Sequence, residues 1–220
     1  LNLRHDFNFL CVAQLGPRKN VDAVINNFIE EFKNDDVGLL LKVHGANDSV
    51  IDFHAIKKQF QNISKAAKEE GWKCSINLLH GNLSDEQMQG LYQHPKVKAM
   101  VSFTHGEGFG LPLYEAVCNG LPVVATDWSG HLDFLAMKAD INSPGKLKGG
   151  KTKGKVVVLE KKFAAVNYEL KTIPKQAVWD GVLQAESKWA YVDDEDAKSK
   201  MRDVFENIEN WETLTNELKE

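Results

Sequence analysis

The chain has 220 residues, of which 43% are hydrophobic, which is ordinary for one globular domain and short for two well-formed ones. Its 27 basic and 31 acidic residues give a net charge of −4. This balance argues against nucleic acid as the main partner, because binding to a phosphate backbone needs a basic face.

Strand-like and helix-like stretches alternate along most of the chain. Short apolar runs predict strands at residues 7–13, 38–44, 75–79, 97–103, 122–126 and 155–160. Helical spacing predicts helices at residues 21–32 and 53–67, from Ser84 onward, and at 111–119, and we expect the region from about Gln176 to the end to be helical too. The alternation predicts an α/β fold, a Rossmann-like doubly wound parallel sheet, as one domain over residues 1–220.

Two helix ends carry local signals. Ser84 followed by Gln87 fits a capping box, and Gly120 fits the residue that ends a helix. Residues 142–155 include SPGKLKGGKTKGK, which is typical of a solvated surface loop. Within it, Gly145–Thr152 fits the P-loop pattern. A P-loop follows a buried strand and opens a helix, whereas this segment leads into the strand-like VVVLE, so the context argues against that interpretation.

The cysteines and histidines indicate neither a disulfide framework nor a metal site. Cys11, Cys74 and Cys118 are scattered, which favours buried thiols in a reducing compartment, and we expect a cytoplasmic protein. The seven histidines include no close pair at the helical spacing of metal ligands. No apolar run approaches the roughly 18 residues that a membrane-spanning helix needs.

The segment VSFTHGEGFGLPLYEAVCNGLPVVATDWSG is the most informative part of the sequence. A buried strand ends at Phe103, a glycine-rich turn follows, and a helix begins near Pro112. Glycines let a ligand approach the backbone, and a helix N-terminus offers unpaired N–H groups with a partial positive charge. The pattern predicts an anion site at the carboxyl edge of a parallel sheet.

Two carboxylates frame this predicted anion site. Glu107 lies in the turn and Glu115 in the first turns of the helix. A carboxylate close to a phosphate is unfavourable unless it accepts hydrogen bonds, and sugars and ribose supply vicinal hydroxyls that donate them. Phosphate together with a polyol indicates a sugar nucleotide as the ligand.

Glu107 and Glu115, with seven residues between them, resemble the E-x7-E motif of the retaining family 4 glycosyltransferases of the GT-B type. The flanking EGFGLP and YEAVCNGLPVVAT agree with that family. The resemblance implies that Glu107 contacts hydroxyls of the donor sugar near the reacting carbon and that Glu115 binds the ribose hydroxyls. It also implies that backbone N–H groups hold the sugar and diphosphate, at Gly108, Phe109, Gly110 and Leu111.

Two further segments resemble the same family. In AQLGPRKNVDAVINNF, Lys19 falls on the family lysine that pairs with the donor diphosphate, which gives it a catalytic role beside Glu107. Gln14 stands where the family has arginine, and Arg18 is a candidate replacement. INLLHGNLSDEQMQGLYQ resembles the strand and loop that hold the nucleotide base, with Leu83 as the candidate contact.

The resemblance implies the C-terminal, donor-binding half of a glycosyltransferase that transfers a glycosyl group from a nucleoside diphosphate sugar. We expect no metal cofactor, and an N-terminal acceptor domain that lies outside this sequence. The acceptor is not identified, whether glycan, lipid or small molecule, and peripheral membrane contact stays open. One alternative is a non-catalytic sugar-nucleotide-binding module, which the glutamine at position 14 in place of the family arginine would favour. The others are a P-loop enzyme and a GT-B sugar-nucleotide epimerase.

Overall fold

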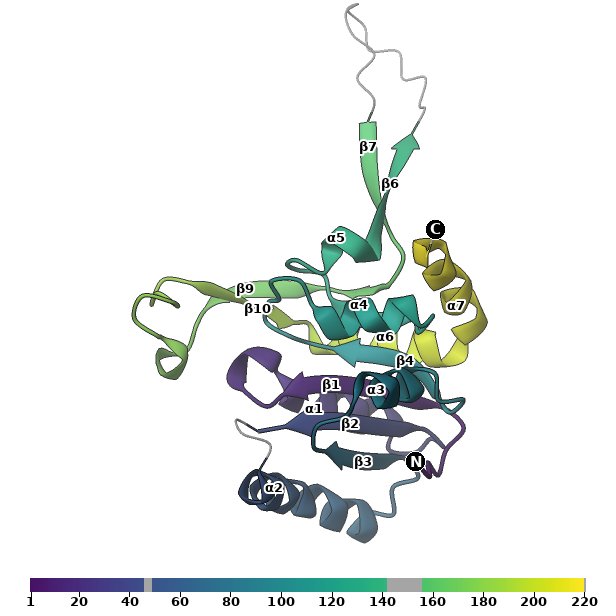
Figure 1. Cartoon of the computed structure of the whole chain (residues 1–220), viewed down its shortest axis with the longest axis vertical. Helices are drawn as coiled ribbons and strands as arrows, with labels where there is room; N and C mark the ends of the chain where they lie inside the picture. The colour runs from purple at the N-terminus through teal and green to yellow at the C-terminus, as the bar shows by residue number, and fades with distance from the viewer. Residues whose placement is uncertain (46–48, 142–155, 220) are drawn as a thin grey trace, which may run out of the picture.

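A computed structural model describes residues 1–45, 49–141 and 156–219. Its central element is a six-stranded sheet in the order β3-β2-β1-β4-β5-β8, with every neighbouring pair parallel (Figure 1). The strands are β1 (Asn8–Gln14), β2 (Gly38–His44), β3 (Ser75–His80), β4 (Val97–Ser102), β5 (Val123–Thr126) and β8 (Ala164–Val166). The Rossmann-like doubly wound sheet predicted from the sequence is confirmed.

Two hydrophobic cores cover the two faces of this sheet. The helices are α1 (Val21–Phe32), α2 (Val50–Glu69), α3 (Asp85–Tyr92), α4 (Leu111–Cys118), α5 (Leu132–Leu135), α6 (Asp194–Glu206) and α7 (Ile208–Asn216). Phe9 belongs to the core that α1, α2 and α6 cover, and the next residue, Leu10, belongs to the core under α3 and α4. Both side chains are fully buried, as the period-two alternation of a strand with two covered faces requires.

The sheet has a topological switch point between β1 and β4. These strands are neighbours, yet α1 packs in one core after β1 and α4 packs in the other core after β4. The connections therefore leave the sheet in opposite directions, and in open α/β sheets the carboxyl ends of strands at such a switch point are where ligands bind.

The predicted helix ends agree with the structure. Ser84 accepts a hydrogen bond from the backbone of Gln87, whose side chain accepts one from Ser84 in return, so the capping box is confirmed. Gly120 has a φ of 83° directly after α4, a left-handed conformation that glycine adopts without strain.

The sequence placed the last strand of the sheet wrongly. Residues 155–160 were expected to extend the main sheet, but β7 (Val156–Lys161) pairs antiparallel with β6 (Ala136–Ile141) in a separate arm (Figure 1). The sixth strand of the main sheet is β8, which has only three residues. The loop and P-loop interpretations of residues 142–155 concern a segment outside the described residues.

The prediction of helix from Gln176 onward is confirmed from Asp194, where α6 and α7 follow, and is wrong for the residues before it. The chain forms an antiparallel pair, β9 (Tyr168–Thr172) with β10 (Lys188–Val192), and the helix begins only at Asp194. The described residues also form three short 3-10 helices, η1 (Pro17–Lys19), η2 (Lys175–Ala177) and η3 (Glu217–Lys219). Trp189 lies in β10 rather than in a helix, because its ring is buried against His105.

The cysteines are free, as predicted, but their burial differs. Cys11 and Cys74 are buried, and burial raises the pKa of Cys11 to about 12. Cys118 is exposed, which corrects the expectation that all three thiols are buried. Within the described ranges, no helix combines the length and the apolar character that crossing a membrane needs.

Candidate functional site

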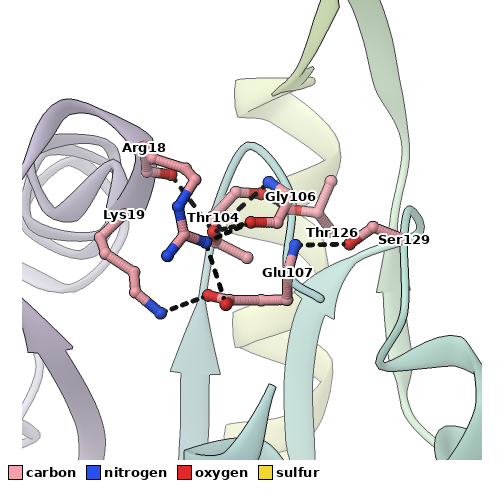
Figure 2. Close-up of polar contacts among 7 residues, drawn as sticks. All are labelled: Arg18, Lys19, Thr104, Gly106, Glu107, Thr126 and Ser129. Carbon is pink, nitrogen blue, oxygen red and sulfur yellow. Dashed lines mark hydrogen bonds and ion pairs between the residues drawn. The ribbon is translucent and has the colours of Figure 1, made fainter. Parts of the chain in front are cut away.

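Three loops meet at the carboxyl edge of the sheet, at the switch point. The loop after β1 contains η1, the loop after β4 is the glycine-rich turn, and the loop after β5 contains Ser129 and Gly130. Figure 2 shows that Arg18 and Lys19 from the first loop point toward Glu107 in the second. Residues almost ninety positions apart in the sequence therefore build one charged site.

Glu107 is bound by two cations. Lys19 Nζ donates to Glu107 Oε1 at 2.5 Å, and Arg18 Nη1 donates to Glu107 Oε2 at 3.0 Å (Figure 2). The Glu107 side chain is 10% exposed, whereas that of Arg18 is 44% exposed. Two cations against one carboxylate leave a local positive charge, and the outer face of the Arg18 guanidinium is open to a further anion.

The ion pairs fix the protonation state of Glu107. Burial by itself raises the pKa of this carboxyl, but the hydrogen bonds from Lys19 and Arg18 and their positive charges outweigh it. The pKa of Glu107 is therefore held below its usual range, and the group is ionised at neutral pH.

The loop after β5 holds the backbone of Glu107 from the other side. The Glu107 N–H donates to Ser129 Oγ at 2.7 Å (Figure 2). The Gly130 N–H donates to the Glu107 carbonyl at 3.1 Å. A side chain at Gly130 has no room, since a Cβ there would lie 2.0 Å from the Gly108 carbonyl oxygen. Ser129 itself has a φ of 84°, a strained conformation for a residue other than glycine.

Two threonines and a backbone contact tie the remaining loops together. Thr126 Oγ1 donates to the Thr104 carbonyl at 3.0 Å, and Thr104 Oγ1 lies 3.2 Å from the carbonyls of Arg18 and Gly106. The His105 N–H donates to the Arg18 carbonyl at 2.9 Å. The charged side chains therefore rest on a hydrogen-bonded backbone frame rather than on a loose surface loop.

The N-terminus of α4 opens beside this frame. Gly110 precedes the helix with a φ of 90°, no side chain caps the first turn, and Pro112 occupies an early position in the helix. Nothing lies within 4 Å of where a Cβ would sit at Gly106 or Gly108. The N–H groups of Leu113 and Tyr114 donate to the Gly110 carbonyl, whereas those of Phe109, Gly110 and Leu111 have no hydrogen-bond partner among the described residues. These N–H groups and the free space over the turn suit an anion that approaches the backbone.

Glu115 has a different environment from Glu107. It lies on α4, and its Oε2 accepts a hydrogen bond of 2.9 Å from the hydroxyl of Tyr92, at the end of α3. Tyr92 was not singled out from the sequence. No pattern marks it, because an aromatic residue at the end of an amphipathic helix is usually a core residue.

The other residues predicted for the site are spread along the same edge of the sheet. Gln14 is the exposed last residue of β1, and Leu83 lies between β3 and the cap of α3, partly buried against the second core. Phe109 and Leu111 have exposed side chains, 49% and 57%, which agrees with contacts made through the backbone. Within the described ranges, no hydrogen bond or ion pair joins Gln14 or Leu83 to the Glu107 cluster.

Two histidines help to build the site. His105 Nδ1 lies 2.7 Å from the Ala190 carbonyl, and its ring stacks on Trp189, which links the glycine-rich turn to β10. His131 is fully buried, with Nε2 at 2.7 Å from the Thr126 carbonyl. Burial lowers the pKa of both histidines, so both are neutral at pH 7. Among the described residues, no group of three or more His, Cys, Asp or Glu could hold a metal ion.

The Rossmann-like parallel sheet, with its glycine-rich turn at the switch point, matches the C-terminal domains of GT-B glycosyltransferases in fold. The chain belongs to the glycosyl transferases group 1 family, whose pattern matches residues 3–142. The matched range includes every residue of the site described above except Trp189 and Ala190. No curated protein matches the sequence.

Solved structures share the fold at low sequence identity. The C-terminal domain of the group 1 glycosyl transferase LpcC from Francisella tularensis matches with a TM-score of 0.61 and 13% identity over 99% of this chain and 84% of that one. The catalytic domain of cholesterol-α-glucosyltransferase from Helicobacter pylori gives 0.54 and 15% over 97% and 95%. HepE from Anabaena, in complex with UDP and glucose, gives 0.59 and 13% over 98% of this chain but only 43% of its own. At these identities the likeness establishes the fold alone.

Proposed function

We propose that this chain is the donor-binding domain of a retaining glycosyltransferase and binds a nucleoside diphosphate sugar at the switch point. The observation that carries the proposal is the meeting of Arg18 and Lys19 on Glu107, directly beside the uncapped N-terminus of α4. A net positive charge, a helix dipole and an open glycine turn together favour a diphosphate.

Each charged group then has a role. Lys19 and Arg18 bind the diphosphate, and Arg18 supplies the positive charge that Gln14 lacks. The backbone N–H groups from Gly108 to Leu111 hold the sugar phosphate. The incoming phosphates take over part of the ion pairing of Glu107. Its carboxylate then accepts hydrogen bonds from hydroxyls of the donor sugar.

Glu115 accepts hydrogen bonds from the ribose hydroxyls. It lies one helical turn from the N-terminus of α4 and has no ion-pair partner among the described residues. Leu83 is the proposed contact for the base. HepE, which has this fold, is described in complex with UDP and glucose, so UDP and its sugars are the first ligands to test.

The chemistry is electrostatic. Transfer leaves a nucleoside diphosphate, and Lys19, Arg18 and the helix N-terminus stabilise the charge that develops on it, a strategy that typically contributes about 3–4 kcal/mol per well-placed donor. No metal is needed because the cations are side chains. Retention of the anomeric configuration is carried over from the E-x7-E resemblance, and the acceptor binds on a domain outside this chain.

Titration calorimetry with UDP, GDP, ADP and their glucose forms, without metal, tests the binding claim. We expect one base to bind, and Glu115→Ala to weaken that ligand by about 1–3 kcal/mol, the loss of a charged hydrogen-bond partner. Glu69→Ala removes an exposed glutamate on α2 and is the matched control, with no change expected. The proposal is wrong if no diphosphate binds at millimolar concentration, or if the control weakens binding equally.

A second experiment separates a transferase from a non-catalytic sugar-nucleotide module. The protein with its acceptor domain is incubated with the donor that binds and with candidate glycan, lipid and small-molecule acceptors, and release of the nucleoside diphosphate is followed. Turnover that Lys19→Ala abolishes supports the transferase, and NMR of the product reports whether the anomeric configuration is retained. Binding with no release of diphosphate supports the non-catalytic alternative.

A further inference from the structure

The bond between Tyr92 and Glu115 joins two helices at the edge of the proposed ribose site. The Tyr92 hydroxyl lies 2.9 Å from Glu115 Oε2, and it is the donor because an ionised carboxylate only accepts. Tyr92 ends α3, and Glu115 lies in the middle of α4. The bond therefore depends on the packing of both helices against the second core.

The orientation of the Glu115 carboxylate depends on this one contact, whereas the Glu107 carboxylate is held by several. Glu107 is bound by two cations and a backbone frame, whereas the Tyr92 hydroxyl is the one polar side-chain group that contacts the Glu115 carboxylate in the described part of the chain. A carboxylate has about four lone-pair sites. Tyr92 occupies one of them and leaves Oε1, and the second lone pair of Oε2, for a ligand.

Tyr92 is a rigid donor. Its side chain is 2% exposed and belongs to the second core together with Leu113 of α4. Burial raises the pKa of Tyr92 far above its usual value, and the bond to Glu115 raises it further, so the hydroxyl keeps its proton. A fixed ring with a protonated hydroxyl holds Oε2 in one place at a small entropic cost.

We infer that Tyr92 is a positioning residue, which orients the Glu115 carboxylate so that it accepts both vicinal hydroxyls of a ribose. Tyr92 thereby sets the preference of this site for ribonucleotides over nucleotides without those hydroxyls. The inference rests on the proposed function. A carboxylate whose plane is already fixed accepts two hydroxyls at a lower entropic cost than a free one. Discrimination by a site built of hydrogen-bonding groups also exceeds what an apolar pocket achieves.

Tyr92→Phe tests the inference, because it removes the hydroxyl and keeps the buried ring. Calorimetry compares UDP, GDP and ADP with their 2′,3′-dideoxy forms on the wild type and on the variant. We expect the wild type to prefer the ribose form, and Tyr92→Phe to weaken that form about three- to tenfold, the loss of one hydrogen bond. The affinity for the dideoxy form should stay within about twofold, so that the preference falls.

Tyr168→Phe is the matched control, since Tyr168 lies on β9 and its hydroxyl has no hydrogen-bond partner among the described residues. Thermal unfolding of each variant is measured alongside. A purely structural role would weaken both ligand forms equally, and that result overturns the inference.

The outcomes also separate this inference from the proposed function. Equal affinity of the wild type for the ribose and dideoxy forms overturns the role of Tyr92 and leaves the diphosphate site standing. A wild type that binds none of the six ligands overturns the proposed function and, with it, this inference. A preference for ribose that survives Tyr92→Phe overturns the inference alone.

Discussion

Replacing Lys19 with methionine removes one of the two cations on Glu107 and keeps most of the side-chain volume. Lys19 Nζ lies 2.5 Å from Glu107 Oε1, and the two side chains are 19% and 10% exposed. A hydrogen bond to a charged group contributes about 1.5–3 kcal/mol, and breaking a fully buried pair costs about 3–5 kcal/mol. Because Arg18 stays in place, we expect Lys19→Met to lower the free energy of unfolding by about 1.5–2 kcal/mol.

Urea unfolding followed by tryptophan fluorescence measures this difference. Lys65→Met is the control, since Lys65 pairs with Glu69 on the surface of α2 with side chains 73% and 65% exposed, and such pairs contribute under about 1 kcal/mol. A double-mutant cycle with Glu107→Gln isolates the coupling between the two groups. If Lys19→Met costs no more than Lys65→Met, the ion pair contributes nothing beyond a surface contact, and our reasoning about its burial is refuted.

Three other predictions concern the frame around Glu107. Gly130→Ala should lower the free energy of unfolding by about 1–3 kcal/mol, because its Cβ would meet the Gly108 carbonyl. Gly90→Ala in α3 is the control, since a Cβ there has open space and should not destabilise the protein. Thermal unfolding compares the two variants, and equal midpoints would contradict the geometry. Folding lowers the pKa of Glu107, so the ionised carboxylate stabilises the protein above pH 4.5, the usual pKa, and this stabilisation is lost as the pH falls through the folded pKa. In urea unfolding at several pH values, Glu107→Gln should therefore reduce the loss of stability at acid pH. An unchanged dependence of stability on pH would contradict this prediction. His105→Ala removes the hydrogen bond to the Ala190 carbonyl and the stacking of the His105 ring on Trp189. It should reduce the hydrogen-exchange protection of amides in β10 by about 1–2 kcal/mol. Unchanged exchange would mean that other contacts hold β10.

The strongly periodic part of the sequence predicted the fold well. Strands β1 to β5 and helices α1 to α4 are long or bounded by clear signals, such as the Ser84 capping box and the left-handed Gly120. The errors fall where tertiary contacts override local pattern. β8 has three residues, too few for any periodic signal, and Trp189 enters a strand because it stacks on His105, more than eighty residues away.

The sequence pointed to charged groups that the structure brings together but not to the contacts that support them, and the binding roles of these groups stay predictions. The E-x7-E spacing and the loop lysine indicated Glu107, Glu115 and Lys19, and the structure adds that Arg18 points to the same carboxylate. The hydrogen bonds of Ser129 and Tyr92 depend on the register between separate loops and helices, which spacing in one sequence does not report.

NMR mapping of a bound nucleoside diphosphate tests the central claim most directly. UDP, GDP and ADP are each titrated into the ¹⁵N-labelled chain, and amide shifts are followed for the one that binds. We predict the largest changes at Gly108, Phe109, Gly110 and Leu111, with smaller ones around Lys19 and none on the outer face of α2. Binding that leaves the glycine-rich turn unchanged and shifts amides elsewhere would contradict the assignment of the donor site to the switch point between β1 and β4.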